Sequence, residues 1–291
     1  MKKILSFSVL VFMLMLVSCE QNSQINPPDD FVEKTLGKFS VEENKQITFS
    51  PGNLQYVVSL KKWQFAQNQW EFRGGDNFPS VRAEKDGFYN NQTVLSDTID
   101  LFGWGTGNNP IICSIDPMDY QTFYDWGRNK IDTYAPNVWR SLTIEEWMYL
   151  LEYRQNAALL YGLARVNGVN GCILLPDSWE CPDGMAFKPG PAGYVEDFDI
   201  ASYQNFSKED WVKLEKSGAV FLPAAGFRIG KDYIAAVQQI GYYWLSSKYE
   251  VPTDDGKVFA YGWYAYLTIE GGVAYGYNSI FGYSVRLVKD L

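Results

Sequence analysis

The sequence predicts an α+β domain in which many short antiparallel strands surround two short helices. The clearest strand signal is segment 219–288, where aromatic and β-branched runs such as FAYGWYAYLTIE alternate with glycine-containing turns. The helix signals lie at 143–146 and 207–210, where Thr or Ser stands three positions before an acidic residue, as in a capping box. Histidine is absent from all 291 residues, which excludes every catalytic or metal site that needs an imidazole.

The first residues have the form of an export signal rather than of a folded element. A positively charged start precedes the apolar stretch 5–17, which is too short to span a bilayer. This stretch ends in Leu-Val-Ser-Cys at 16–19, which resembles the lipobox of bacterial lipoproteins. The resemblance implies a signal peptide over 1–18 and acylation of Cys19 with chains such as palmitate, which together would hold the protein stably on a membrane. An ordinary signal peptide with an incidental cysteine is the alternative.

The acidic charge balance narrows the classes of partner. The formal net charge is −9, and no cluster of Lys or Arg interrupts it. Nucleic-acid binding needs a basic surface, so we expect no nucleic-acid partner. Anionic lipid headgroups are excluded as a target for the same reason, which leaves the anchor as the membrane link.

Aromatic residues make up 16% of the chain, with ten Trp and twenty Tyr. Part of this excess must form the core, because Trp and Tyr carry the largest apolar areas available. The remainder is available for an exposed binding face, since Tyr supplies contact area at little entropic cost.

The mature chain is predicted to contain one domain behind a linker. Residues 19–37 are polar and contain prolines and a run of acids, which is typical of a flexible tether. A single domain then covers 38–291. Within it, 38–72 predicts N-terminal β-hairpins, and 73–137 is a loop-rich ordered insertion expected to fold over the core.

Two short helices and a hairpin follow the insertion. Thr143 caps the first helix, which places Trp147 on its inward face. Ser207 begins the second helix, and Gly218 stands at the position after its end. Between them, the sequence predicts a β-hairpin around the turn residues 167–171.

Five motifs in order resemble a known family of exported bacterial domains. They are RSLTIEEWMYLL, VNGVNGCILLPDSW, AVFLPAAGFR, GYYWLSS and GYSVRLV, which fall between residues 140 and 288. The family was first noted as a major paralogous domain of Fibrobacter and is abundant in lipoproteins of Bacteroidota. Its domains are similar to the C-type-lectin-like and formylglycine-generating-enzyme fold. The resemblance covers roughly residues 38–291 and implies twisted antiparallel sheets, two short flanking helices and long ordered loops that carry recognition.

The resemblance does not imply enzymatic activity, because proteins of this fold have many unrelated functions. Formylglycine-generating enzymes use a close pair of copper-binding cysteines late in the domain, and no cysteine follows Cys181 here. A glycan-active enzyme would need a carboxylate pair, and no spacing singles one out. The available acids are Asp116, Asp119, Asp125 and Asp177.

A calcium site like that of many C-type lectins is also not expected. Such a site needs several oxygen ligands, including a Trp-Asn-Asp sequence that is absent here. Pro176 and Asp177 supply only a proline and one acid, and Asp254-Asp255 before Gly256 is typical of a solvated turn. We therefore expect no metal and no cofactor.

Three cysteines remain beside Cys19, an odd number for an oxidising compartment. Cys172 and Cys181 are close enough in sequence to be bridged across a turn. That pairing would leave Cys113 buried and free, and counting free thiols on the unfolded protein tests it.

Several residues are predicted to be structural. Arg286 lies within an apolar C-terminal run. Its guanidinium is predicted either to bind a ligand or to form a structural ion pair. The structural reading pairs Arg286 with Glu145 or Glu146 at a junction of sheet and helix. Trp147 and Trp244 are expected in the frame of the fold.

The Tyr-rich stretch near the C-terminus is the candidate ligand-binding face. Side chains alternate along a strand, so Phe259 and Tyr261 share one face while Tyr264 and Tyr266 share the other. The second aromatic face is either covered by other elements or exposed for binding. In relatives of the fold the terminal strands and loops contact ligands, which implies the residues Tyr249, Tyr264, Tyr266, Tyr275, Tyr277, Asn278 and Ser279.

The leading hypothesis is therefore a non-enzymatic, lipid-anchored binding protein of the outer membrane, facing the periplasm or the cell surface. Its ligand is an unidentified glycan or protein. A glycan-active enzyme or accessory domain and a structural subunit of a surface assembly are the alternatives.

Overall fold

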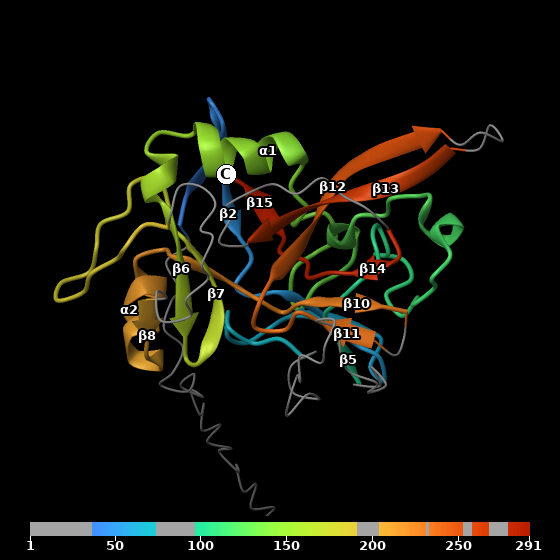
Figure 1. Cartoon of the computed structure of the whole chain (residues 1–291), viewed down its shortest axis with the longest axis horizontal. Helices are drawn as coiled ribbons and strands as arrows, with labels where there is room; N and C mark the ends of the chain where they lie inside the picture. Colours follow the sequence, from blue (N-terminus) through green and yellow to red (C-terminus); the bar gives the residue numbers. More distant parts are fainter. Residues whose placement is uncertain (1–36, 74–96, 191–203, 231–232, 253–257, 268–278) are drawn as a thin grey trace, which may run out of the picture. The chain divides into compact units, whose positions relative to one another are not determined.

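Short hairpins and two capped helices build the fold (Figure 1). The computed structural model describes residues 37–73, 97–190, 204–230, 233–252, 258–267 and 279–291. By its contacts the chain divides into Met1–Glu33 and Lys34–Leu291, and all described residues belong to the second unit. The expected signal peptide, Cys19 and nearly all of the tether lie outside the described residues.

The strands and helices follow one another in many short pieces. The strands of the first part of the chain are β1 (Phe39–Glu42), β2 (Lys45–Phe49), β3 (Leu54–Val57), β4 (Lys62–Phe65), β5 (Thr98–Ile99), β6 (Tyr161–Val166), β7 (Val169–Leu174) and β8 (Gln204–Phe206). Those of the C-terminal part are β9 (Val220–Pro223), β10 (Phe227–Ile229), β11 (Tyr233–Ala235), β12 (Gly241–Pro252), β13 (Val258–Leu267), β14 (Phe281–Gly282) and β15 (Val288–Asp290). The helices are α1 (Ile144–Met148) and α2 (Lys208–Lys216), with a π-turn, η3 (Tyr149–Tyr153), and the 3-10 turns η1 (Pro117–Tyr120), η2 (Trp126–Arg128) and η4 (Ala157–Leu159).

The described strands form small sheets rather than one large one. Their orders are β1-β2-β15, β4-β3-β5, β8-β6-β7-β9, β11-β10-β14 and β12-β13. The pairing is antiparallel except between β6 and β8. The segment 219–288 therefore contributes to several sheets, and β15 closes the first one against β2. The predicted mixed α+β class with mostly antiparallel sheets and two short helices is confirmed.

The N-terminal hairpins form where the sequence places them. β1 and β2 pair in register from Phe39 opposite Ile47, and β3 and β4 pair from Leu54 opposite Phe65. In β1 and β4 buried apolar residues alternate with more exposed polar ones, so one side of each of these strands enters the core.

The hairpin of β6 and β7 turns earlier than predicted. Its turn consists of Asn167 and Gly168 alone, both with positive φ, as a type I′ turn requires. Asn170 and Gly171, expected in the turn, belong to β7 instead, and Gly171 lies opposite Pro223 of β9. The turn prediction is therefore correct in place and too long.

Both helix starts are capping boxes, as predicted. The Thr143 hydroxyl accepts from the amide of Glu146, whose carboxylate accepts from the amide of Thr143. Ser207 and Asp210 make the same reciprocal pair at α2. Gly218 follows α2 with φ of +89°, which suits a glycine after a helix end.

Most of the tryptophans that the structure describes lie in the core. Trp147 of α1 shares one buried cluster with residues of β1, β2 and β15, and Trp211 of α2 shares another with residues of β6 and β7. Helix α2 itself lies beside β8 (Figure 1). Trp244 and Tyr283 belong to a further cluster with residues of the region 97–140. Of the nine tryptophans whose side chains the structure describes, seven are buried: Trp63, Trp104, Trp126, Trp139, Trp147, Trp211 and Trp244.

Candidate functional site

The longest strands of the described chain form a ribbon of their own. β12 and β13 run side by side from Gly241 opposite Leu267 to Pro252 opposite Val258, with an irregularity between Trp244 and Lys248 (Figure 1). No other described strand joins this two-stranded sheet. We call it the β12–β13 ribbon.

The root of the β12–β13 ribbon is fixed in the core. Trp244 is 2% exposed, and its indole Nε1 donates to the carbonyl oxygen of Phe102 at 2.5 Å. The ring of Tyr242 stacks on Tyr283 with centroids 4.7 Å apart, and the amide of Ser246 donates to Leu142. The predicted structural role of Trp244 agrees with this burial, and the ribbon has a rigid base.

The backbone positions of three predicted ligand residues fall in this ribbon. Tyr249 lies opposite Tyr261, Tyr264 opposite Trp244, and Tyr266 opposite Tyr242. The remaining predicted residues Tyr275, Tyr277 and Asn278 lie outside the described residues.

The prediction that Ser279 contacts a ligand is wrong. Its side chain is completely buried, and its carbonyl oxygen accepts from the amide of Trp104. Within the described part of the chain its hydroxyl has no hydrogen-bond partner. A side chain in this position does not belong to a surface patch.

A loop with three exposed aliphatic side chains lies against the β12–β13 ribbon. Ile111, Ile115 and Met118 are 55%, 68% and 49% exposed, and η1, which contains Met118, lies beside β13. Exposed aliphatic side chains that gather in one short segment indicate a contact surface. We call these three side chains the 111–118 patch. The sequence contains this signal in PIICSIDPM, but the patch was not among the predicted residues.

Buried groups hold the patch in place. The guanidinium of Arg228, 1% exposed, donates to the carbonyl oxygens of Leu101, Gly230 and Ile112 at 3.1, 2.5 and 3.4 Å. The Tyr120 hydroxyl donates to Ser114 at 2.9 Å, and burial raises its pKa to about 12. The loop therefore has an ordered backbone beneath its exposed apolar residues.

Arg286 lies at the centre of a buried group of polar side chains. Its predicted partner, Glu145 or Glu146, is wrong. Arg286 is 3% exposed, and its guanidinium donates to Gln69 Oε1 and, at 3.4 Å, to Asn53 Oδ1. Glu146 instead accepts from Arg140 and Lys45 at 2.7 Å each, and Glu145 is exposed. Burial lowers the pKa of Arg286 to about 10, so the group stays protonated at neutral pH.

Gln69 connects Arg286 to a carboxylate. Its amide nitrogen donates to Glu215 Oε1 at 2.8 Å, while its oxygen also accepts from the amide of Phe221 at 2.9 Å. Neutral Gln69 thus stands between the buried cation and the acid of α2. Arg286 is a structural residue, held by amides rather than by an ion pair.

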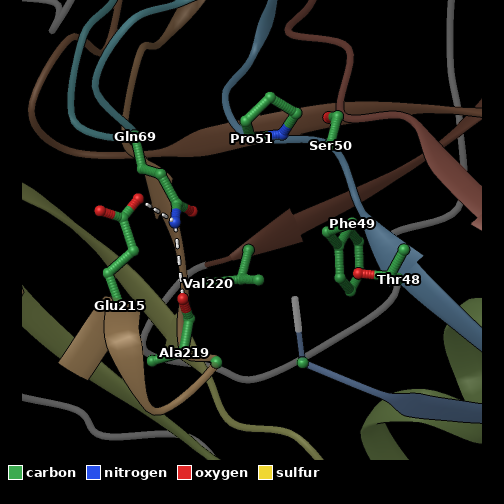
Figure 2. A pocket seen from close by; sticks show the side chains of 10 residues that line it. Thr48, Phe49, Ser50, Pro51, Gln69, Glu215, Ala219 and Val220 are labelled. Carbon is green, nitrogen blue, oxygen red and sulfur yellow. Dashed lines mark hydrogen bonds between the residues drawn. The ribbon is translucent and has the colours of Figure 1, made fainter. Parts of the chain in front are cut away.

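A small cavity opens beside Gln69 (Figure 2). Its volume is about 20 Å³, which is enough for a water molecule and far too small for a sugar ring. The polar side chains among its lining residues are Thr48, Ser50, Gln69 and Glu215. The cavity is therefore not the binding site for a glycan or peptide.

Three of the four acids considered for catalysis serve separate structural roles, and the fourth is exposed. Asp116 and Asp125 cap η1 and η2, and burial raises the pKa of Asp125. Asp177 forms an ion pair with Arg154 at 3.2 Å, and Asp119 is exposed. Among the described residues, no group of three or more Cys, Asp or Glu side chains has the arrangement of a metal site.

The predicted disulfide between Cys172 and Cys181 is wrong. Both thiols are free: Cys172 is buried in β7, whereas Cys181 is exposed in the following loop. Burial raises the pKa of the Cys172 thiol to about 12, which leaves it unreactive. Cys113 is free as predicted but half-exposed rather than buried.

Comparisons of the chain with protein-family models, with curated proteins and with solved structures gave no match. Within the described residues, no helix has the length and apolarity needed to cross a membrane.

Proposed function

We propose that this chain is a non-enzymatic binding protein, exported and anchored to the outer membrane through acylated Cys19. Its domain is of the C-type-lectin-like type, and it captures a glycan or a protein at the periplasmic or the cell surface. The observation that carries the binding proposal is the β12–β13 ribbon, which is fixed at its root and lies beside the 111–118 patch.

The composition of this surface supports a partner of appreciable size. Tyr-rich strands combine apolar contact area with hydroxyl groups, a combination that suits both sugars and protein surfaces. The cavity beside Gln69 is too small for such a ligand. The contact is therefore expected on the outside of the domain.

Anchoring is tested separately from binding. Replacing Cys19→Ser removes the only residue that the lipobox resemblance assigns to acylation. The variant is expected to leave the membrane fraction, and a variant that stays membrane-bound contradicts the proposal.

Binding is tested with the full chain on an array of glycans and host proteins. The double variant Ile115→Ser/Met118→Ser removes two members of the 111–118 patch, and it is expected to lose most of the signal. Leu60→Ser is the matched control, because Leu60 is 69% exposed on the β3–β4 turn. An equal loss of binding in both variants, or no loss in the patch variant, contradicts the proposed surface.

A further inference from the structure

The small cavity beside Gln69 lies between strand β2 and helix α2 (Figure 2). Thr48 lines it from β2, Ser50 from the turn that follows β2, and Glu215 from the last turn of α2. Gln69, from the segment between β4 and β5, completes the set of polar side chains. The cavity therefore brings together polar groups from three parts of the chain that are distant in sequence.

Thr48 contributes a buried hydroxyl group to this cavity. The residue is 2% exposed, and among the described residues its Oγ1 has no hydrogen-bond partner. Its backbone pairs with Lys289 of β15, so the sheet fixes the place of the side chain. Figure 2 shows the hydroxyl turned toward the other lining residues. Buried hydroxyl groups are nearly always paired, either with protein or with ordered water, because an unpaired one destabilises the fold.

The size and the charges of the cavity favour a small neutral ligand. Its volume of about 20 Å³ accommodates one water molecule. The carboxylate of Glu215 repels an anion at this place. A cation is repelled by the guanidinium of Arg286, which donates to the side chain of Gln69 at the cavity wall.

We infer that the cavity binds one ordered water molecule, which joins Thr48, Ser50 and Glu215. The water accepts from the Thr48 hydroxyl and donates to the other two side chains. Ser50 Oγ donates to the carbonyl oxygen of Gly52 at 2.9 Å, which leaves its lone pairs able to accept. Glu215 accepts from Gln69 at 2.8 Å, and a carboxylate has several further acceptor positions. Three hydrogen bonds are the usual number for a water molecule inside a protein.

This water attaches the end of α2 to a sheet at the other side of the cavity. Glu215 belongs to the last turn of α2, whereas Thr48 lies in the central strand of the sheet β1-β2-β15. A bridging water contributes nearly as much as a direct hydrogen bond. The inference concerns the stability of the domain and is independent of the proposed binding function.

The sign of the stability change in Thr48→Val tests the inference, because valine has the shape of threonine without its hydroxyl. If water binds there, the variant loses hydrogen bonds, and its melting temperature is expected to fall by about 3 °C. A hydroxyl without a partner would instead make valine the more favourable residue, so an unchanged or higher melting temperature overturns the inference. Thr133→Val, at an exposed threonine, is the matched control and is expected to shift the melting temperature by less than about 1 °C.

A crystal structure of the full chain, at a resolution that shows ordered water, tests the site directly. One electron-density peak is expected within about 3.2 Å of Thr48 Oγ1, Ser50 Oγ and a carboxylate oxygen of Glu215. The peak is expected to weaken in Thr48→Val. Wild-type protein without such a peak overturns the inference. A peak with five or more oxygen contacts at about 2.4 Å overturns it as well, since that geometry indicates a cation.

Discussion

Arg286 is the residue with the most demanding surroundings. It keeps its charge in the core, and its hydrogen-bond partners Gln69 and Asn53 are neutral. Removing one partner of a buried charge costs much more than the hydrogen bond itself contributes, because the charge cannot regain its hydration. Gln69 is the more important partner, because its side chain also accepts a hydrogen bond from the amide of Phe221 and donates one to Glu215.

Gln69→Leu is therefore expected to lower the free energy of unfolding by about 3 kcal/mol. Gln67→Leu, at an exposed glutamine two positions away, is the control and is expected to cost less than about 0.5 kcal/mol. Both values come from urea unfolding. The double variant Gln69→Leu/Arg286→Met is expected to recover part of the loss, because it removes the charge with its partner. A double variant weaker than Gln69→Leu alone contradicts this account.

The sequence predicts residues well where the interaction is local. The pairs Thr143–Glu146 and Ser207–Asp210 are three residues apart, so the capping chemistry is visible in the sequence. Arg286 and Gln69 are 217 residues apart, and nothing near either residue indicates the other. The predicted pairing with Glu145 or Glu146 is wrong because local sequence does not show which side chains the topology brings to Arg286.

At the scale of elements, the β6–β7 hairpin shows why the turn was predicted too long. Its sequence contains two Asn-Gly pairs, each of which is a good turn signal alone. The first pair makes the turn, while Gly171 is glycine for another reason: a Cβ there would lie 2.3 Å from the carbonyl oxygen of Leu222. That neighbour belongs to β9, which local sequence does not reveal.

Substitutions at the two glycines separate these reasons. Gly168 has φ of +83° and open space around it, so Gly168→Ala is expected to cost about 1 kcal/mol through backbone strain alone. Gly168→Asn is expected to cost less, because Asn tolerates this conformation. At Gly171 the order reverses, since a larger side chain collides more severely with β9. Thermal unfolding measures both series, and the same order at both positions contradicts the assignment.

Contacts between residues distant in the sequence also limited the prediction of the candidate site. The Tyr-rich strands of the ribbon were predicted from alternation, whereas the 111–118 patch beside them was missed because the loop 97–137 has no periodic pattern. Ser279 was included because it follows the Tyr-rich run, although it is buried. Which loop residues reach the surface depends on Arg228 and on β10, which are distant in sequence.

At the scale of the whole molecule, Glu146 connects the two ends of the domain. It accepts from Lys45 at the start of β2 and from Arg140, which also bonds Asp290 of β15 at 2.6 Å. Burial alone would raise the pKa of Glu146, but hydrogen bonds from Arg140 and Lys45 outweigh it and lower the pKa. Hydrogen bonds from Arg140 likewise lower the pKa of Asp290.

These shifts determine the expected pH dependence of folding. A carboxyl group whose pKa is lower in the folded state stabilises the protein above its unfolded pKa, about 3.9–4.3 here, and loses that contribution as the pH falls further. Glu146→Gln is therefore expected to lower stability by about 2 kcal/mol at pH 7. The difference from wild type should narrow below about pH 4, where both states of the wild-type residue take up a proton. Glu145→Gln, on the exposed side of the same helical turn, is the control and should cost less than about 0.5 kcal/mol at either pH. The stability of both variants is measured by urea unfolding at pH 7 and pH 3. A loss of unfolding free energy in Glu146→Gln that is the same at the two pH values contradicts a stabilising role for the charge of Glu146.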